Sequence, residues 1–297
     1  MELRQLQYAV MLAEERNFSR AAEKLHLAQP SLSQQIIKLE KELGVSLFER
    51  RPGDILLTFA GKRFIDQASK IIDQVELLKK EMQDVANTNL GQLVIGSLPI
   101  TGAHILPPAL PLFQQEFPGV ELVLVEETTS NLEVLTSRGQ TDISLLSMPI
   151  SNPELEIIPL LEEEIVLAVP PGHFLAEQGI VSLAECQQEA FIFLKKGQGF
   201  REISEGLCRQ AGFEPKVVFE STNIETVQSL VAAGMGVAFI PQMVTRTRRA
   251  HVPVYLSICD LVATRTLVIA YKKGRYLSKA ATSFISMLKS VVEKGDF

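Results

Sequence analysis

The side chains that could do catalytic or metal chemistry are few and scattered along this 297-residue sequence. The four histidines, His26, His104, His173 and His251, stand apart, and no HxxxH or CxxC spacing indicates a metal site. The sequence contains no GxSxG nucleophile elbow, no Walker loop and no GxGxxG after an expected strand. We therefore expect a protein that is not an enzyme and that holds neither a metal nor a cofactor.

The cysteine pattern and the hydropathy of the sequence indicate the cellular compartment of the protein. Cys186, Cys208 and Cys259 are odd in number and far apart, which is typical of reduced thiols rather than of a disulfide framework. No run approaches the roughly 20 apolar residues that cross a bilayer. The first residues mix acids with apolar positions and lack a small-residue cleavage site, so we expect a cytoplasmic protein without a membrane partner.

The net charge of −6 is unevenly distributed. Residues 1–65 carry 10 Lys and Arg against 8 Asp and Glu, a net +2. Residues 66–297 carry 19 against 27, a net −8. Local basic patches set the attraction to phosphate, so the N-terminal excess permits nucleic-acid binding without establishing it.

Polar residues that could read DNA bases lie on a predicted helical hairpin in residues 19–40. A first helix fits Ser19 to Leu25, with Ser19 suited to cap it, and a second fits Pro30 to about Glu42. The second helix has an apolar stripe formed by Leu32, Ile36, Leu39 and Leu43. The stripe leaves Gln29, Ser31, Ser33, Gln34 and Lys38 on or beside the opposite face. This spacing fits both a plain hairpin in water and a helix whose Gln and Ser side chains reach base edges in the major groove.

A long helix is predicted over residues 59–87. Its apolar residues follow a strict 4,3 spacing: Phe64, Ala68, Ile71, Val75, Leu78, Met82 and Val85. This heptad seam fits an amphipathic helix that lies on its own domain, and equally a helix that joins two copies of the chain. Its place between a DNA-binding candidate and a separate domain favours dimerisation.

From Gly91 onward, apolar strands alternate with helices. We expect strands at 92–97, 121–127, 142–147, 164–169, 190–194, 216–220, 237–241 and 266–271. We expect helices near 101–116, 130–138, 200–211, 223–234 and 278–293. This alternation predicts parallel sheets covered on both faces, arranged as two lobes with a ligand cleft at the strand ends. The run Glu162–Glu164 fits a solvated junction between the lobes.

Residues 18–64 strongly resemble the N-terminal region of LysR-type transcriptional regulators. The matching residues are Ala21–Ala22, Leu25, Gln29–Leu32, Ser33, Ile36, Leu39–Glu40, Leu43–Gly44, Leu47–Arg50, Thr58 and Gly61. The resemblance continues through the long helix and through 91–97, 105–122, 139–146 and 228–241. It implies a winged helix-turn-helix head (1–58), a linker helix for dimerisation (59–90) and a regulatory domain (91–297). That domain would be an α/β unit similar to periplasmic solute-binding proteins, with lobe I at about 91–163 and 266–297 and lobe II at about 164–265.

The resemblance implies a recognition helix at 30–41 and a wing at about 46–58. DNA contacts would come from Arg20, Gln29, Pro30, Ser31, Ser33, Gln34, Lys38, Arg50 and Arg51. Arg50 and Arg51 would touch phosphates or the minor groove, although two solvated surface arginines fit the sequence as well. The family often has Arg where this chain has Gln34, and Gln favours adenine whereas Arg favours guanine.

The resemblance also places an effector between the lobes. Its contacts would be Ser97, Pro99, Ile100, Thr101, Thr128, Thr129, Ser147, Met148, Phe200, Arg201, Thr222 and Asn223. The Ser and Thr residues stand where strands give way to helices, so each also suits simple helix capping. Arg201 could pair with a carboxylate, or lie exposed on the first turn of its helix. An organic acid or an amino acid fits this set.

The expected partners are double-stranded promoter DNA, a small-molecule effector and further copies of the chain, as a homodimer or a homotetramer. Contact with RNA polymerase is left open. A solute-binding or carrier protein is the alternative, and sequence-dependent, salt-sensitive binding to DNA would distinguish a regulator from it.

Overall fold

The chain forms two compact units, Met1–Thr88 and Asn89–Phe297. The computed structural model describes residues 1–51, 54–86, 90–246 and 252–295. Within these residues, every helix is too short or too polar to cross a membrane.

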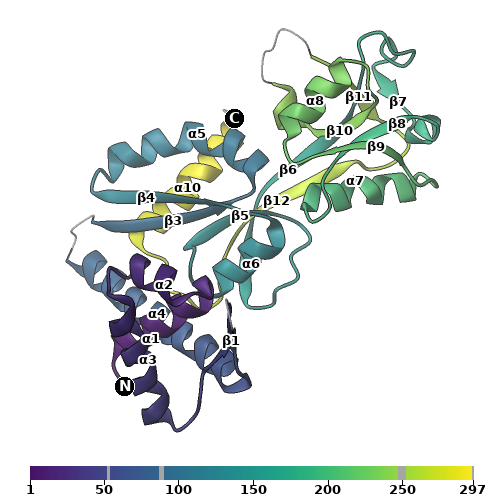
Figure 1. Ribbon diagram of the computed structural model, residues 1–297. Helices are drawn as coiled ribbons and strands as arrows, with labels where there is room; N and C mark the ends of the chain where they lie inside the picture. The colour runs from purple at the N-terminus through teal and green to yellow at the C-terminus, as the bar shows by residue number, and fades with distance from the viewer. Residues whose placement is uncertain (52–53, 87–89, 247–251, 296–297) are drawn as a thin grey trace. The chain divides into compact units, whose positions relative to one another are not determined.

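The first unit consists of helices packed around a small apolar core, followed by a hairpin and a long helix (Figure 1). Its elements are α1 (Leu3–Glu15), α2 (Phe18–Lys24), α3 (Gln29–Leu43), β1 (Phe48–Arg51), β2 (Asp54–Leu57) and α4 (Phe59–Val85). Ala21 and Ala22 of α2 are buried against Leu32 and Ile36 of α3 in this core. Small side chains on α2 allow the close approach that two crossing helices need.

The beginnings of α2 and α3 correct one expectation. Ser19 is not the cap of α2, because the helix begins one residue earlier and Asn17 caps it. The Asn17 side-chain oxygen accepts the backbone N–H groups of Ser19 and Arg20 at 2.9 and 3.1 Å. Asn and Ser are equally good caps, so propensity alone could not choose between them. The first turn of α3 contains Pro30 and has no side-chain cap.

Hydrogen bonds hold the β1–β2 hairpin at the end of α3. A carboxylate oxygen of Glu40 accepts the backbone N–H groups of Leu47 and Phe48 at 2.6 and 3.1 Å. The N–H of Thr58 donates to the carbonyl of Leu47 at 3.0 Å. The Thr58 hydroxyl in turn accepts the N–H of Gly61 at 2.8 Å, which caps α4. These bonds fix where the hairpin ends and the long helix starts.

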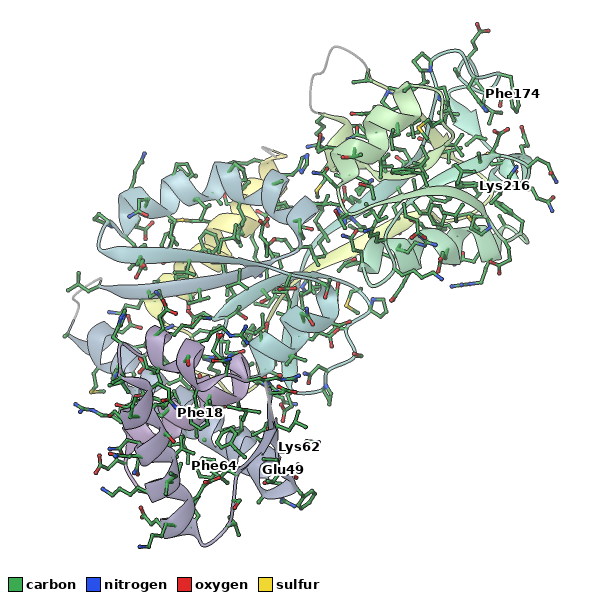
Figure 2. All side chains as sticks on the ribbon, in the orientation of Figure 1. Phe18, Glu49, Lys62, Phe64, Phe174 and Lys216 are labelled. Carbon is green, nitrogen blue, oxygen red and sulfur yellow. The ribbon has the colours of Figure 1, made fainter. Side chains whose placement is uncertain are left out.

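The heptad residues of α4 have two different environments. Phe64 packs on the core of the first unit, as does Phe18 of α2 (Figure 2), and Ala68 is fully buried. Further along, Ile71, Leu78 and Met82 are exposed. Val75 is half-buried, and the side chain of Val85 lies outside the described residues. The interpretation that the helix lies on its own domain therefore holds for the first part of the seam only.

The second unit is built on one long mixed sheet, with a two-stranded parallel sheet beside it (Figure 1). Its strands are β3 (Gly91–Ser97), β4 (Val120–Glu126), β5 (Ile143–Ser147), β6 (Leu155–Val169), β7 (Ile180–Val181), β8 (Ala190–Leu194), β9 (Lys216–Ser221), β10 (Ala238–Pro241), β11 (Val254–Ile258) and β12 (Thr264–Lys272). Its helices are α5 (Pro99–Glu116), α6 (Thr129–Ser137), the 3-10 helix η1 (Leu183–Cys186), α7 (Gly199–Gln210), α8 (Ile224–Ala232), α9 (Gln242–Thr245) and α10 (Lys279–Lys294). The main sheet runs in the order β4-β3-β5-β12-β6-β11-β7, with β10 also paired to β6.

Two groups of elements flank the strands β6 and β12 (Figure 1). We call lobe I the group formed by β3, β4, β5, α5, α6 and α10. Lobe II is the group formed by β7 to β11 with α7, α8 and α9. The first part of β6 pairs with β12 beside lobe I, and its last residues pair with β10 and β11 in lobe II. The strand β6 is therefore common to both lobes, and one apolar core extends through both.

The expectation of purely parallel sheets is wrong at the centre of this unit. The strand pairs β3–β4, β3–β5 and β8–β9 are parallel as predicted, but β12 lies antiparallel between β5 and β6. The first part of β6 was not expected as a strand, because Pro159 and the run Glu162–Glu164 interrupt its apolar pattern. A bulge accommodates the proline, since Val268 pairs with Pro159 while Leu267 pairs with Leu161. The short strands β7 and β11 were also not expected.

We predict that Gly61→Ala loosens the junction between the hairpin and α4. A Cβ atom at Gly61 would lie 2.0 Å from the carbonyl oxygen of Leu47, a backbone atom that cannot move without breaking its bond to Thr58. We expect a loss of about 1–3 kcal/mol of local stability. Hydrogen exchange measured by mass spectrometry should show roughly 10- to 100-fold faster exchange across residues 44–64. In the control Gly172→Ala, the new Cβ meets no atom within 4 Å, and unchanged exchange is expected. Equal exchange in both variants would contradict this account of the junction.

Candidate functional site

The first candidate site is the exposed face of α3. Leu32, Ile36 and Leu39 are buried in the core, so the opposite face of the helix is open to solvent. The predicted contact residues Gln29, Pro30, Ser31, Gln34 and Lys38 are exposed, and Ser33 is half-buried. The structure thus places the predicted residues of α3 together on or beside one polar surface. Their amides, hydroxyls and ammonium group can donate or accept hydrogen bonds at base edges and phosphates.

One exposed residue of α3 was missed by the sequence analysis. Ile37 is 49% exposed, although it directly follows the buried Ile36. An exposed branched side chain beside Gln34 and Lys38 could contact the methyl group of thymine. The sequence does contain a signal for this exposure, because Ile37 lies outside the apolar stripe of the helix.

Two further basic residues, Arg20 and Lys24, lie on α2, the helix that precedes α3. The Arg20 guanidinium is largely exposed, and its Nη2 donates to the carbonyl of Glu15 at 2.6 Å. Lys24 forms an ion pair with the same glutamate at 2.5 Å. The side chains of Arg50 and Arg51 lie outside the described residues, so their predicted contacts remain predictions.

The second candidate site is a cavity of about 250 Å³ between lobes I and II. Most of its lining surface is apolar, with contributions from Leu98, Ile100, Leu194 and Phe200. Of the predicted effector contacts, its lining includes Pro99, Ile100, Thr128, Ser147, Phe200 and Thr222. An adjoining cavity of about 340 Å³ contains Thr129 and Met148 and shares Ser147 and Gly199 with the first. The structure therefore brings together residues that are more than 100 positions apart in the sequence.

Four predicted effector contacts lie outside the described lining of both cavities. Ser97 and Thr101 are fully buried; the Ser97 hydroxyl donates to the carbonyl of Leu98, while the Thr101 hydroxyl has no partner among the described residues. Asn223 caps α8, accepting the N–H of Glu225 at 2.7 Å. The capping role considered for the Ser and Thr residues of the set is performed by Thr128, whose hydroxyl accepts the N–H of Asn131 at the start of α6.

Arg201, the fourth, corrects both interpretations of that residue, because it is neither in the described lining nor exposed. The side chain is 4% exposed, and its guanidinium is bound by Glu205 at 2.6 Å and Glu220 at 2.8 Å. It also donates to the carbonyl of Leu194 at 2.8 Å and lies over the ring of Phe193. Burial acts to lower the pKa of Arg201, but the two carboxylates outweigh burial and raise the pKa above its usual value. Arg201 is therefore a structural cation.

The cation that does line the first cavity is Arg265, which the sequence analysis missed. Its Nε and Nη2 lie 2.6 and 2.5 Å from the same carboxylate oxygen of Glu163, and both side chains are buried. The guanidinium lies 5.4 Å from the centre of the Phe200 ring. Burial lowers the pKa of Arg265, while the attraction of Glu163 acts in the opposite direction. Glu163 also accepts the N–H of Met243 at 3.0 Å, so the expectation of a solvated Glu162–Glu164 run is wrong for Glu163.

Comparison with known proteins agrees with this architecture. Residues 3–62 match the family model described as the bacterial regulatory helix-turn-helix protein, lysR family. Residues 86–293 match the LysR substrate binding domain. The chain is 41% identical to the uncharacterized HTH-type transcriptional regulator YcgK of Bacillus subtilis, covering 99% of this chain and 97% of that protein. It is 35% identical to the DNA-binding transcriptional dual regulator OxyR of Escherichia coli, covering 92% and 90%.

Solved structures show the same fold. A full-length OxyR from Pseudomonas aeruginosa, solved as a cysteine variant, superposes with a TM-score of 0.76 at 27% identity, covering 99% of this chain and 95% of that one. CbnR, a LysR family transcriptional regulator, gives a TM-score of 0.68 at 23% identity, covering 98% and 99%, and supports the fold alone. The helix-turn-helix head, the long helix and the two-lobed domain thus match full-length regulators from end to end. The chain belongs to the LysR family of DNA-binding transcriptional regulators, which carry a substrate-binding effector domain.

Proposed function

We propose that residues 1–58 bind promoter DNA through α3, that residues 59–90 join two copies, and that residues 91–297 bind the effector. The observation that carries the DNA-binding role is the division of α3 into a buried apolar face and an exposed polar face. Gln29 and Gln34 can each form paired hydrogen bonds with adenine, and Ile37 adds an apolar contact. Lys38 and Arg20 attract phosphates, which orient the head without reading sequence. Because the protein acts on promoter DNA, we infer that it works in the cytoplasm.

The start of α3 supports the same role. The first turn of α3 has no side-chain cap, because Ala28 occupies the capping position. Pro30 has no N–H and the Ser31 N–H donates to the carbonyl of Ala28 at 3.0 Å, so the group that can meet a phosphate oxygen there is the N–H of Gln29, at the positive end of the helix dipole. The helix would therefore approach DNA with its N-terminal end, where Gln29 and Ser31 are exposed.

Dimerisation is supported by the exposed half of the α4 seam. Ile71, Leu78 and Met82 are large apolar side chains, and the heptad spacing places them on one stripe. A second copy of α4 would cover them and would hold two heads at a fixed spacing. A dimer or a tetramer built in this way could bridge two DNA sites, and a change in head spacing would alter promoter bending or contact with RNA polymerase.

The effector role rests on the cavity between lobes I and II. Its apolar lining and its volume of about 250 Å³ suit a compact organic molecule, since pockets for drug-sized ligands begin at roughly 300 Å³. Because β6 and β12 join the lobes, closing the cavity on a ligand would twist these strands and shift one lobe against the other. A twist of this kind would change how the paired heads are spaced on DNA.

Chemical sensing through a thiol is the second candidate, since several relatives are named hydrogen peroxide-inducible genes activator. Peroxide reacts with thiolates, so a sensor cysteine needs a low pKa and access to solvent. Cys186 and Cys208 are buried, and burial raises the pKa of each to about 12. Cys259 is exposed. These environments favour reversible binding of an effector over a buried thiol switch.

Gel shift and fluorescence anisotropy with DNA from upstream of the protein's own gene test the DNA-binding role. Gln29→Ala should weaken binding to that DNA far more than binding to random DNA, by about 1–3 kcal/mol, because a base contact is lost. Arg20→Ala should weaken binding to the upstream DNA and to random DNA alike. The slope of log affinity against log salt concentration should fall in magnitude by about one, because one phosphate contact is lost. Equal losses on both DNAs for Gln29→Ala would contradict its assignment.

A change in the exposed seam tests the dimer. Leu78 and Met82 are 58% and 51% exposed in one chain, so Leu78→Lys with Met82→Lys should leave each chain folded but place like charges in the α4 contact. Sedimentation velocity should then show a smaller assembly. The control Val262→Lys changes an apolar residue that is 79% exposed outside α4 and should leave the assembly unchanged. If the double variant sediments like the original protein, the hypothesis that the chain dimerises through the α4 seam is wrong.

Thiol reactivity separates the two sensing candidates. At neutral pH a thiol with a pKa of about 12 is almost wholly protonated, so the native protein should react with one equivalent of Ellman's reagent, at Cys259. Unfolding in denaturant should release all three thiols. Rapid modification of Cys186 or Cys208 by hydrogen peroxide in the native protein, with a change in DNA binding, would favour the thiol sensor instead.

A further inference from the structure

We propose that the effector of this chain is an organic cation, with its apolar body in the first cavity and its ammonium group beside Glu133 in the second. The inference rests on the effector role proposed above and names the chemical class of the ligand. It differs from the expectation of an organic acid or an amino acid, in which Arg201 could pair with the carboxylate of the ligand.

The two cavities form adjoining chambers of one site, because Ser147 and Gly199 line both. The first, which we call the apolar chamber, is walled by Leu98, Ile100, Leu194 and Phe200. The second, which we call the polar chamber, is lined largely by hydroxyl and carboxylate side chains. They come from Thr129, Ser130, Glu133, Ser147, Ser151 and Glu202. A ligand that fills both chambers needs an apolar part and a strongly polar part.

Glu133 is a buried carboxylate with room for a partner. It is 7% exposed, and its Oε2 accepts the N–H and the hydroxyl of Ser151 and the N–H of Asn152 at 2.9 to 3.2 Å. Its other oxygen, Oε1, takes part in none of these bonds. The described residues that line the polar chamber include no Lys, Arg or His to pair with it. Because a buried charge is usually paired, a ligand cation is the natural partner for Oε1.

Unused hydroxyl groups point to a polar ligand at the same place. Ser147 is 4% exposed, lines both chambers, and its hydroxyl has no hydrogen-bond partner among the described residues. The hydroxyl of Thr129 is also buried without a partner there. Buried hydroxyls normally have partners, and an ammonium group can donate to two hydroxyls and a carboxylate at once.

The charge balance of the whole cleft favours a cation. Glu126 and Glu127 line the apolar chamber, and Glu133 and Glu202 line the polar one. The basic side chain among the described lining residues is Arg265, and Glu163 already neutralises it. The described lining residues thus present four carboxylates and one guanidinium, and that guanidinium already has a carboxylate partner. An anionic ligand would have to overcome this excess.

The test uses three probes that share a phenylethyl body and differ in the polar group, measured on the full chain: 2-phenylethylamine, 2-phenylethanol and 3-phenylpropionate. Calorimetric titration should show millimolar or tighter binding of the amine, with binding of the alcohol and the carboxylate at least tenfold weaker. Glu133→Gln should reduce amine affinity about tenfold and leave alcohol affinity unchanged, because only the charge-assisted bond is lost. Glu177→Gln, which changes an exposed carboxylate that lines neither chamber, is the matched control.

Glu133 also accepts hydrogen bonds from Ser151 and Asn152, so Glu133→Gln could weaken binding by disturbing the fold. A second variant tests the site without this complication. Glu202→Gln alters an exposed side chain in the first turn of α7 and should weaken amine binding several-fold while the melting temperature stays constant. The proposal is overturned if the amine does not bind, if the carboxylate binds as tightly, or if both variants bind the amine like the original protein.

Anisotropy with upstream DNA, measured on the same samples, separates this inference from the effector role. If 3-phenylpropionate binds more tightly and shifts DNA affinity, the effector role stands and the cationic class is wrong. If the amine binds through Glu133 without any change in DNA affinity, the site is correct and the effector role fails.

Discussion

The antiparallel pairing of β6 with β12 is the constraint on which the second unit depends. These strands pair from Leu155 opposite Lys272 to Glu164 opposite Thr264, and the last part of β6 then continues into lobe II. At that end of the ladder, Glu163 and Arg265 form a buried ion pair. Buried pairs add little net stability over an apolar pair, but breaking one leaves an unpaired charge at a cost of about 3–5 kcal/mol. The pair therefore favours a single register at the point where the lobes join.

The same ion pair connects this junction to the cavity. Arg265 lies over Phe200 at the start of α7 and forms part of the cavity wall, while Glu163 holds the backbone of Met243 in α9. A ligand that moves Phe200 would therefore also act on Arg265, which pairs with Glu163 where the two lobes join. Coupling between effector and lobe orientation would then run through direct contacts.

Much of this fold could be predicted from spacing, because spacing reflects which face of an element is buried. The stripe of α3, the seam of α4 and the strand-to-helix turns that line the cavity all follow from local patterns. The bulge at Pro159 and the antiparallel β12 could not be predicted in this way, since both depend on a partner strand about 100 residues away. Ala68 is buried and Ile71 is exposed, and this difference likewise depends on how far the first unit covers α4.

The candidate site shows the same division. Thr128, Ser147 and Phe200 could be placed because each stands at a predicted turn. The choice between Arg201 and Arg265 could not, because it depends on which carboxylates surround each guanidinium in space. Glu205 lies one helical turn from Arg201, but Glu220 and Glu163 come from other strands.

The pairing of Glu164 with Thr264 also means that the chain enters and leaves lobe II at neighbouring points. Lobe II is in effect an insertion within lobe I, with its two ends side by side on adjacent strands. An exchange of residues 165–263 between relatives would therefore need only two splice points, both in regular β-structure. Such an exchange would change the part of the cavity wall that lobe II supplies, including Leu194 and Phe200, while lobe I would keep Glu133 and Ser147.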